Sequence, residues 1–335
     1  MIRVAINGFG RIGRIAFRQI LTGTDFDIIA INSRSSVPED FAYLAKYDTV
    51  HGSFHEDEIS YDEDSLIICG KKHIKVFSEE DPSNLPWKDL NIDLVLECSG
   101  AFTSKEGAMK HINAGAKKVL ISAPGKDEMP TIVYGVNDDT LKNDDIIVSA
   151  SSCTTNCLAP TLKIINDNFG IEKGFMSTIH AYTSDQNILD NTHKKGINSR
   201  RGRAGVENIV PASTGAAKSI GLVIPTLAGK MDGMAFRVPT PDGSIIDTTL
   251  ELKRNVTVEE INNAFLNNQS EVLKFTMDPI VSCDILGKKL GGIVDGQSTK
   301  IVECDGKQLV KVVAFYDNEY GYTSQMLRTA KKMFN

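Results

Sequence analysis

A glycine-rich turn near the start of the sequence restricts the fold more than any other feature. Residues 2–6 form a short apolar run, and residues 8–13 read Gly-Phe-Gly-Arg-Ile-Gly before a helical pattern. In a βαβ unit, Gly8 allows the tight turn, Gly10 lets the backbone approach a pyrophosphate, and Gly13 lets helix and strand pack closely. The free N–H groups of the helix N-terminus favour an anion there. This context predicts a dinucleotide site rather than a glycine turn without a ligand.

Similar apolar runs recur through the first 150 residues, and each is bounded by turn-forming residues. Most lack polar alternation, which is typical of strands covered on both faces, as in a parallel sheet between helices. We therefore expect a doubly wound α/β domain over residues 1–150. Its further strands are expected at residues 27–31, 92–97, 118–121, 131–135 and 146–149.

After residue 150 the pattern changes. Ser152 can cap a helix over residues 153–168, which Gly170 would end. Longer segments that alternate polar and apolar residues follow, and they predict a mostly antiparallel sheet in an α+β domain over residues 151–317. These segments are residues 174–181, 233–237, 245–252 and 311–316. The pattern at 322–333 indicates a final helix that could pack on either domain.

Length and composition agree with two ordinary globular domains. The chain has 335 residues and a net charge of −6, which argues against a protein that binds polyanions over its whole surface. Its six cysteines are too sparse for a disulfide framework, and none forms a C-x-x-C pair that would suggest zinc. We expect reduced thiols, no metal, no signal peptide, no membrane span and a cytoplasmic location.

The end of the second expected strand lacks an acidic residue. A carboxylate there usually binds the adenine-ribose 2′-hydroxyl, but this sequence has Asn32, Ser33 and Arg34. Ser33 and Arg34 could donate to a 2′-phosphate, which makes NADP plausible. Alternatively, Arg34 is a solvated loop residue and the site binds NAD without an acidic anchor.

Cys153 is a candidate nucleophile because it falls in the first turn of the expected helix. Free N–H groups there stabilise a thiolate and can bind an oxyanion. His180 follows on an expected strand, and a helix followed by a returning strand can bring the two side chains together. Cys157 lies one helical turn after Cys153; a packed core thiol explains it better than a redox relay.

Several motifs along the whole chain together resemble those of the phosphorylating glyceraldehyde-3-phosphate dehydrogenases. They occur in order at residues 8–13, 46–52, 121–124, 152–160, 180–183, 213–218, 237–241 and 316–322. The resemblance implies a homotetramer whose C-terminal helix, residues 318–335, joins the cofactor domain. It also implies oxidation of glyceraldehyde 3-phosphate, with phosphate and NAD or NADP, to 1,3-bisphosphoglycerate.

The resemblance assigns roles to individual positions. Cys153 would attack the aldehyde, and His180 would lower the pKa of that thiol and take the hydroxyl proton. A thioester would form and inorganic phosphate would release it. Thr183 and Arg237 would bind the substrate's C3 phosphate. The second phosphate, or the substrate itself, would contact Ser152, Thr154, Arg201, Thr214 and Gly215. The cofactor cleft would include Gly8, Gly10, Arg11, Ile12, Gly13, Glu80, Ser122 and Asn318.

Three departures from the family pattern bear on the cofactor. Ser33 stands where NAD-dependent members usually carry Asp, and Asn191-Thr192 stands where NAD-specific bacterial members often have Leu-Pro. Both remove obstacles to a 2′-phosphate, to which Thr192 of a neighbouring subunit could donate, so we favour NADP. The third is the basic segment 193–203, which is longer than the family pattern. It leaves open which of three arginines, Arg200, Arg201 and Arg203, serves the phosphate site.

Two other functions fit parts of this pattern. An erythrose-4-phosphate dehydrogenase shares the fold and the Cys/His pair but passes its thioester to water. A non-catalytic redox-sensing or RNA-binding protein could use the same cleft, although it would not require Cys153, His180, Thr183 and Arg237 together. The direction of the reaction in the cell is left open by the sequence.

Overall fold

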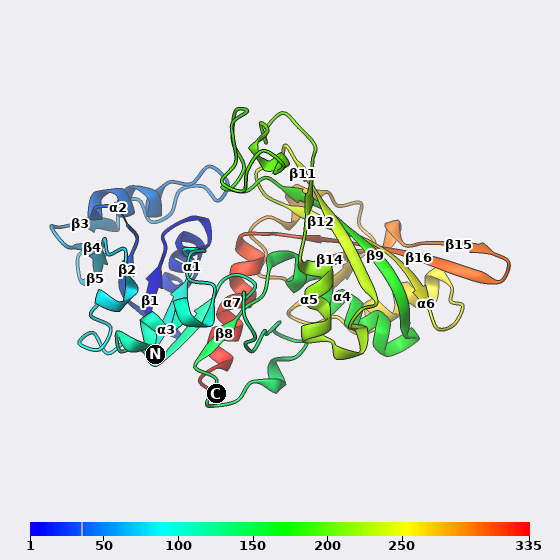
Figure 1. Cartoon of the computed structure of the whole chain (residues 1–335), viewed down its shortest axis with the longest axis horizontal. Helices are drawn as coiled ribbons and strands as arrows, with labels where there is room; N and C mark the ends of the chain where they lie inside the picture. The colour runs from blue at the N-terminus through cyan, green and yellow to red at the C-terminus, as the bar shows by residue number, and fades with distance from the viewer. Residues whose placement is uncertain (35) are drawn as a thin grey trace. The chain divides into compact units, whose positions relative to one another are not determined.

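The chain folds into two compact units in the computed structural model, which describes residues 1–34 and 36–335 (Figure 1). The first unit contains Met1–Ile132, Asp138–Ser151 and Met326–Asn335. The second contains Val133–Asn137 and Ser152–Gln325. These limits differ from the expected ones, because residues 133–137 cluster with the second unit and only the end of the C-terminal segment clusters with the first.

The first unit is built on an eight-stranded sheet with the order β3-β4-β5-β2-β1-β6-β7-β8. Strands from β5 through β8 in this order are parallel, and β3, β4 and β5 form an antiparallel edge. The strands are β1 (Ile2–Asn7), β2 (Phe26–Asn32), β3 (Ile59–Tyr61), β4 (Ser65–Ile68), β5 (Lys72–Phe77), β6 (Leu94–Glu97), β7 (Lys118–Ile121) and β8 (Ile147–Ser149). The helices are α1 (Arg11–Leu21), α2 (Pro38–Lys46) and α3 (Lys105–Asn113), with short 3-10 turns at Pro82–Asn84 and Asp138–Thr140.

Both faces of this sheet are buried. Alternate residues of β1 enter different hydrophobic clusters: Val4 and Ile6 pack in one, and Ala5 packs in the other. All three are fully buried, and each large aliphatic side chain so buried stabilises the fold by about 1.5–3 kcal/mol. The continuous apolar runs therefore predicted the doubly wound parallel sheet correctly.

The strand expected at 131–135 is wrong. Only Thr131 pairs, in an isolated bridge with Ser149. The next residues turn back, because the Val133 N–H donates to Asn137 Oδ1 at 2.9 Å and the Val136 N–H donates to the Val133 carbonyl. Local side-chain hydrogen bonding by Asn competes here with extended pairing.

The second unit contains a sheet with the order β10-β11-β9-β12-β16-β14-β13, and β15 pairs with β16. Most pairs are antiparallel, while β9 with β11 and β13 with β14 are parallel. The strands are β9 (Ile171–Ala181), β10 (Val210–Ser213), β11 (Met231–Val238), β12 (Ser244–Leu252), β13 (Leu273–Thr276), β14 (Gly292–Asp295), β15 (Lys300–Cys304) and β16 (Lys307–Tyr316). This sheet confirms the expected α+β character of the second half.

The helices of the second unit cover one face of its sheet. Figure 1 shows α4 (Cys153–Phe169) and α5 (Ala216–Val223) beside the long strands, and α4 and α5 share a core with them. The other helical segments are α6 (Val258–Asn267) and 3-10 turns at Arg200–Gly202, Pro225–Leu227, Ser282–Ile285 and Gly296–Ser298. The last helix, α7 (Tyr320–Lys332), supplies residues to both units, and its Met326 and Ala330 pack in the core of the first.

The beginning of α4 follows the sequence prediction. Ser152 Oγ accepts a hydrogen bond from the Thr155 N–H at 3.1 Å, and Gly170 ends the helix with φ of 70°. A cap of this kind stabilises a helix by about 1 kcal/mol and sets its first residue, Cys153. Among the helices of the described residues, none is long and apolar enough to cross a membrane.

Candidate active site

The thiol of Cys153 lies beside the imidazole of His180. Sγ and Nε2 are 3.4 Å apart, which is within hydrogen-bond distance for sulfur. Cys153 opens α4, and His180 lies near the end of β9, the strand that follows α4 in the chain. The chain reversal between these elements brings together two residues that are 27 positions apart. The two expected residues therefore lie within hydrogen-bond distance of each other.

Arg237 lies on the far side of the imidazole from the thiol. The parallel register of β11 and β9 places Arg237 opposite His180. Arg237 Nη1 is 2.8 Å from His180 Nδ1, 3.1 Å from the Ala181 carbonyl and 3.3 Å from Thr183 Oγ1. The sheet register therefore places the positive charge of Arg237 next to Nδ1 of His180, the candidate base.

His180 Nδ1 has one neighbour that can only accept and one that can only donate. It lies 2.7 Å from the Ala181 carbonyl and 2.8 Å from Arg237 Nη1. The Nη1 hydrogens of Arg237 can also be accepted by Ala181 O and Thr183 Oγ1. When the imidazole proton is on Nδ1 and is donated to Ala181, Nε2 can accept the thiol proton of Cys153.

Burial dominates the electrostatics of this pair. It raises the pKa of Cys153, while the positive charge of Arg237 lowers it. Burial and Arg237 lower the pKa of His180 to about 3, so its imidazole is neutral near pH 7. The nearby positive charge is that of Arg237, while the effect of His180 on the pKa of Cys153 stays a prediction.

A polar network extends from Arg237 to a second arginine. Thr183 donates its hydroxyl to Asp185 Oδ1, and Arg201 Nη1 donates to Asp185 Oδ2. Although burial opposes ionisation, these bonds from Thr183 and Arg201 hold the pKa of Asp185 below its usual range. Asp185 thus links Thr183 and Arg201, which were both expected from the sequence. Sequence reasoning missed Asp185 itself because no local pattern marks a carboxylate in this loop.

This network has unused donors. Arg237 is 9% exposed, and within the described part of the chain its Nε has no hydrogen-bond partner. The same holds for Nε2 of Gln186, which is also buried. Buried donors without a partner cost free energy, and an anion within hydrogen-bond distance would satisfy the Nε of Arg237.

The basic segment separates the three arginines that the sequence left unresolved. Arg201 binds Asp185, whereas Arg203 Nε donates to Asp190 at 2.9 Å in an exposed pair. Arg200 is exposed and, with Arg201, lines a cavity of about 360 Å³ that also contains Lys195. Arg201 is therefore the arginine connected to Thr183 and Arg237.

Thr154 contributes to a buried chain of hydroxyl groups. Its Oγ1 lies 2.9 Å from the hydroxyl of Tyr316, which lies 2.8 Å from Thr178 Oγ1. The Tyr316 ring packs edge-on against the His180 ring, with centroids 5.9 Å apart. Burial raises the pKa of Tyr316, so the phenol stays protonated. Tyr316 and Thr178 were missed as site residues, although Tyr316 belongs to a quoted motif.

The remaining expected phosphate residues lie on two helix N-termini. Ser152 caps α4, while Thr214 and Gly215 precede α5, with Thr214 Oγ1 accepting from the Ala216 N–H at 3.2 Å. Gly215 is exposed at the N-cap of α5. Over residues 1–34 and 36–335, neither Thr214 nor Gly215 forms a hydrogen bond with Cys153 or His180.

The first unit contains a cavity of about 460 Å³ around the glycine-rich turn. Gly8 has φ of 96°, and a Cβ there would collide with the backbone of Ser99, while a Cβ at Gly13 would collide with the carbonyl of Gly8. Gly10 faces open space instead, and no side chain caps α1. This turn thus has room and N–H groups for a pyrophosphate, as the sequence predicted.

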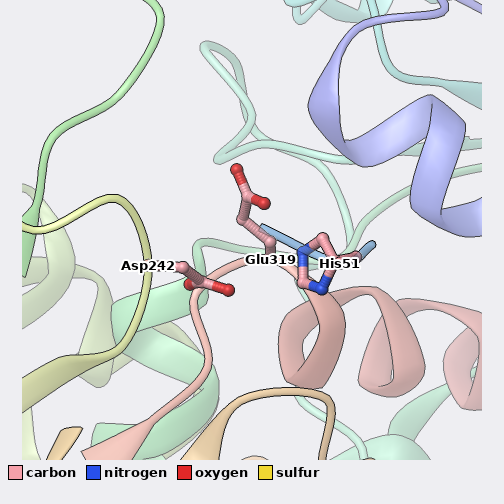
Figure 2. A group of neighbouring side chains, drawn as sticks. All are labelled: His51, Asp242 and Glu319. Carbon is pink, nitrogen blue, oxygen red and sulfur yellow. The ribbon is translucent and has the colours of Figure 1, made fainter. Parts of the chain in front are cut away.

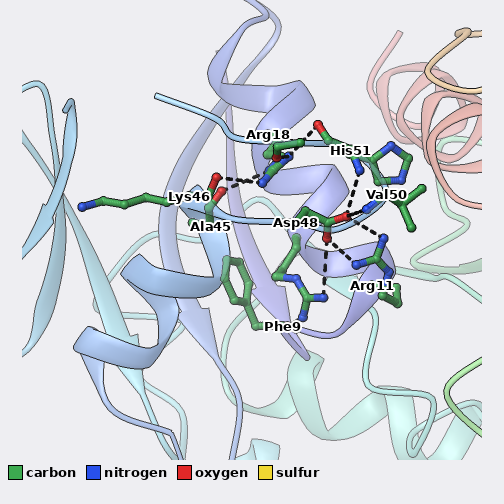
Figure 3. Close-up of polar contacts among 10 residues, drawn as sticks. Phe9, Arg11, Arg18, Ala45, Lys46, Asp48, Val50 and His51 are labelled. Atoms are coloured by element: carbon green, nitrogen blue, oxygen red, sulfur yellow. Dashed lines mark hydrogen bonds and ion pairs between the residues drawn. The ribbon is translucent and has the colours of Figure 1, made fainter. Parts of the chain in front are cut away.

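Arg11 of the same turn is held by Asp48 (Figure 3). Arg11 Nη2 donates to Asp48 Oδ1 at 3.0 Å, and the same oxygen accepts from the N–H groups of Val50 and His51. Burial opposes the charge of Asp48, but these bonds outweigh it and keep its pKa well below the usual range. Ile12 is half-buried and packs against the core.

The cavity is also lined by Asn32, Ser33, Arg34, Glu79 and Glu80. Arg34 Nη1 pairs with Glu80 Oε1 at 3.2 Å, and both side chains are largely exposed. The structure thus gives Arg34 a partner, where the sequence suggested either a 2′-phosphate ligand or a solvated residue.

Three further expected residues lie in separate places. Ser122 follows β7, and its N–H donates to the Glu97 carbonyl at 3.0 Å. Asn318 is buried in the second unit, where its Oδ1 accepts from Ser244 Oγ at 2.6 Å. Thr192 is exposed and its N–H donates to Asn191 Oδ1.

An acidic group lies in the second unit near the end of the quoted 237–241 motif. Burial raises the pKa of Asp242 to about 9, and the neighbouring carboxylates of Asp317 and Glu319 add to this. Figure 2 labels Asp242 and Glu319, which both belong to the second unit. Asp242 is therefore protonated near pH 7 and adds little negative charge to the second unit.

Cys157 is completely buried in the core of the second unit. Burial raises its pKa, which keeps the thiol protonated and unreactive. All six cysteines are free, as expected. The structure thus favours the packed core thiol over a redox relay.

Comparison with known proteins agrees with this geometry. Residues 2–105 match the model of the glyceraldehyde 3-phosphate dehydrogenase NAD binding domain, and residues 152–318 match that of the C-terminal domain. Proteins named glyceraldehyde-3-phosphate dehydrogenase from Clostridium acetobutylicum and Clostridium pasteurianum are each 53% identical over 329 residues, covering 98% of this chain and 97% of theirs. One from Lactobacillus delbrueckii subsp. bulgaricus is 50% identical over 333 residues, with the same coverage. This chain belongs to the glyceraldehyde 3-phosphate dehydrogenase family.

Proposed function

We propose that the chain catalyses the reversible oxidative phosphorylation of glyceraldehyde 3-phosphate to 1,3-bisphosphoglycerate, with a nicotinamide dinucleotide as oxidant. The observation that carries this proposal is the Cys153–His180 pair at 3.4 Å, with Arg237 behind the imidazole. A nucleophile, a neutral base and a buried cation in one place suit attack on the aldehyde of an anionic substrate.

In this proposal Cys153 forms the covalent bond to the substrate and His180 transfers the protons. The sulfur of Cys153 bonds to the aldehyde carbon while His180 Nε2 takes the thiol proton and returns it to the new oxyanion, giving a thiohemiacetal. His180 then takes the hydroxyl proton as the carbon is oxidised, which leaves a thioester on Cys153. The bound dinucleotide supplies the hydride acceptor. Phosphate oxygen attacks the thioester carbonyl, the Cys153 sulfur leaves, and the acyl phosphate is released.

Two anion sites serve these steps in the proposal. Thr183 and Arg237 bind the C3 phosphate, with Arg201 held nearby through Asp185. Ser152, Thr154, Thr214 and Gly215 belong to the attacking phosphate or to the substrate. The unpartnered Nε of Arg237 supports the first assignment, because a phosphate oxygen would satisfy it.

For the cofactor, we propose use of NADP, alone or together with NAD. The glycine-rich turn, with Arg11, Ile12 and Ser122, would hold the dinucleotide in the first unit, and Asn318 would orient the nicotinamide amide. Ser33 in place of a carboxylate supports NADP, because Asp there would repel a 2′-phosphate. Arg34 adds a cation at the same end of the cavity, although Glu80 competes for it.

By resemblance, we also propose a homotetramer in the cytoplasm, in which Thr192 reaches the cofactor of a neighbouring subunit. The exposed apolar side chains of Ile188, Leu189 and Ile197, near Thr192 in sequence, support contact with another subunit. The mass of the particle in solution, measured by light scattering, tests this.

Dependence on inorganic phosphate tests the main proposal. We expect reduction of NAD or NADP with glyceraldehyde 3-phosphate to require phosphate and to yield an acyl phosphate. Turnover that is unchanged without phosphate, and faster with erythrose 4-phosphate, would instead support the erythrose-4-phosphate dehydrogenase reaction. A chain that binds the dinucleotide but oxidises neither aldehyde would support the non-catalytic alternative.

A further inference from the structure

A row of buried polar side chains crosses the carboxyl ends of three neighbouring strands in the first unit. Asn32, Asn7 and Glu97 are the last residues of β2, β1 and β6, and they are register partners. Asn32 Nδ2 donates to Asn7 Oδ1 at 2.7 Å, and Asn7 Nδ2 donates to Glu97 Oε2 at 2.5 Å. All three are at least 97% buried. Burial of such groups is tolerated only when they are hydrogen-bonded, as here.

Glu97 accepts hydrogen bonds on both carboxylate oxygens. Oε1 accepts from the N–H of Ser99 at 2.8 Å and from the Ser99 hydroxyl. Oε2 accepts from Asn7 and lies 3.1 Å from Nε2 of His111. An ionised carboxylate is an acceptor only, and these donors match that state.

The proton position on His111 is determined by Trp87. The indole Nε1–H can only donate, and it lies 3.0 Å from His111 Nδ1. Nδ1 must therefore accept, so the imidazole proton is on Nε2 and points to Glu97. His111 and Trp87 are both fully buried. The chain of donors thus runs in one direction, from Trp87 through His111 to Glu97.

This network ends at the wall of the cavity. Asn7, Asn32 and Ser99 all line the cavity, as does Glu79, whose N–H donates to Asn32 Oδ1 at 2.8 Å and whose carbonyl accepts from Asn32 Nδ2 at 3.0 Å. Glu97 itself is not among the lining residues. The buried carboxylate of Glu97 and the amides of Asn7 and Asn32 therefore connect four segments of the chain by hydrogen bonds. These segments are the ends of β1 and β2, residue 79 and residues 97–99.

We propose that Glu97 and His111 are positioning residues for cofactor binding. They hold Ser99, Asn7 and Asn32 in the geometry that the adenosine end of the dinucleotide requires, without touching it. The proposal rests on the proposed function only in taking this cavity as the dinucleotide site. Removing the carboxylate acceptor leaves donors facing donors, so the wall of the cavity must rearrange.

Glu97→Gln is the direct test, with Asp93→Asn as its matched control. Asp93 directly precedes β6 at the opposite end of the strand, where it accepts from the Arg3 N–H at 2.9 Å and Lys117 Nζ at 2.7 Å. For Glu97→Gln we expect the Kd of NAD and NADP, measured by calorimetry, to rise about tenfold, or about 1.4 kcal/mol. We expect kcat at saturating cofactor to change less than about twofold, and Asp93→Asn to leave Kd within about twofold.

Trp87 reports whether the variants fold. It is the one tryptophan of the sequence and is fully buried, so folded Glu97→Gln and Asp93→Asn keep the emission of a buried indole. The indole N–H donates to His111, so the folding of His111 variants is checked by circular dichroism instead. If Glu97→Gln does not fold, a pair at His111 replaces it. Gln can still donate to Glu97 whereas Phe cannot, so we expect His111→Phe to raise Kd about tenfold and His111→Gln to raise it less than about threefold.

Three outcomes would overturn the positioning role. The first is unchanged dinucleotide affinity in folded Glu97→Gln or His111→Phe, and the second is an equal loss of affinity in Asp93→Asn. The third is a parent protein that binds no dinucleotide, which would also remove the proposed function. A parent that binds dinucleotide but oxidises no aldehyde contradicts the proposed function alone, because Kd is measured without substrate.

Discussion

His180 Nδ1 lies 2.8 Å from Arg237 Nη1, so the candidate base is in contact with a buried cation. The parallel register of β9 and β11 places these residues opposite each other. Arg237 and burial together keep the imidazole neutral, which is the state a base needs before it accepts a proton. The same arginine reaches Thr183 in the proposed substrate site. Arg237 thus lowers the pKa of His180 and also belongs to the proposed site for the substrate phosphate.

Replacing Cys153 with Ser separates catalysis from cofactor binding. A Ser hydroxyl ionises far less readily than a thiol, so we expect kcat to fall by more than about a thousandfold. The first unit contains the cavity around the glycine-rich turn, so the Kd of the dinucleotide should stay within about twofold. Steady-state kinetics and calorimetry measure the two quantities. Substantial activity in Cys153→Ser would refute the thioester route.

Loss of Arg237 should make the Cys153 thiol less acidic. Its positive charge lowers the pKa of Cys153, so Arg237→Gln should move the midpoint of iodoacetamide alkylation to higher pH. Arg237→Lys keeps the charge and should give a smaller displacement. We also expect the KM of glyceraldehyde 3-phosphate to rise at least about tenfold in Arg237→Gln. An alkylation profile identical to that of the parent would contradict this account.

Asp185 should matter for substrate affinity although it is not itself a phosphate ligand. It anchors both Thr183 and Arg201, so Asp185→Asn should raise the KM of glyceraldehyde 3-phosphate about tenfold. Asp190→Asn is the matched control, because Asp190 pairs with the exposed Arg203 in the same loop region. The control should change KM less than about twofold, since exposed ion pairs contribute little. Equal effects of the two substitutions would show that the loop as a whole, not this anchor, sets KM.

Cofactor choice should respond to Ser33 and Glu80 in opposite directions. Ser33→Asp introduces a carboxylate that repels a 2′-phosphate, so the ratio of kcat/KM for NADP to that for NAD should fall about tenfold or more. Glu80→Gln frees Arg34 and should raise this ratio about two- to fivefold, the effect of an exposed pair. Asp64→Asn, which removes an exposed pair with Lys75 outside the cavity, is the control. A parent that strongly prefers NAD would overturn the proposed NADP use.

The lowered pKa of His180 predicts how stability depends on pH. The unfolded chain protonates this imidazole below about pH 6.5, whereas the folded chain does so only near the folded pKa of about 3. Between these values the unfolded state binds more protons, so the free energy of unfolding falls as the pH falls, by up to about 1.4 kcal/mol per pH unit.

His180→Asn should remove this contribution and flatten the acid side of the stability profile. Urea unfolding of parent and variant at several values between pH 4 and 7 measures the effect. Parallel stability profiles for the two proteins would show that His180 is protonated in the folded state and would contradict the assigned neutral imidazole.

The elements that start and end with local signals could be predicted from the sequence. The glycine-rich turn, the Ser152 cap and the Gly170 stop each act within a few residues, so their effect is visible in the pattern. Cys153 and His180 could be proposed as a pair for the same reason, since only one helix and one turn separate them. The prediction of a strand at 131–135 was wrong because the Val133 N–H donates to the side-chain oxygen of Asn137 instead of pairing with another strand.

The sequence by itself determined the family, the α/β and α+β character of the two halves, and the candidates for the residues that carry the chemistry. Only the tertiary structure decided which distant residues meet: Asp185 with Arg201, Tyr316 with Thr154, and Glu97 with His111. These contacts depend on strand register and on the packing of separate segments, which no local pattern encodes. The same packing removes water from His180 and Arg237, and that burial sets the protonation state of the base.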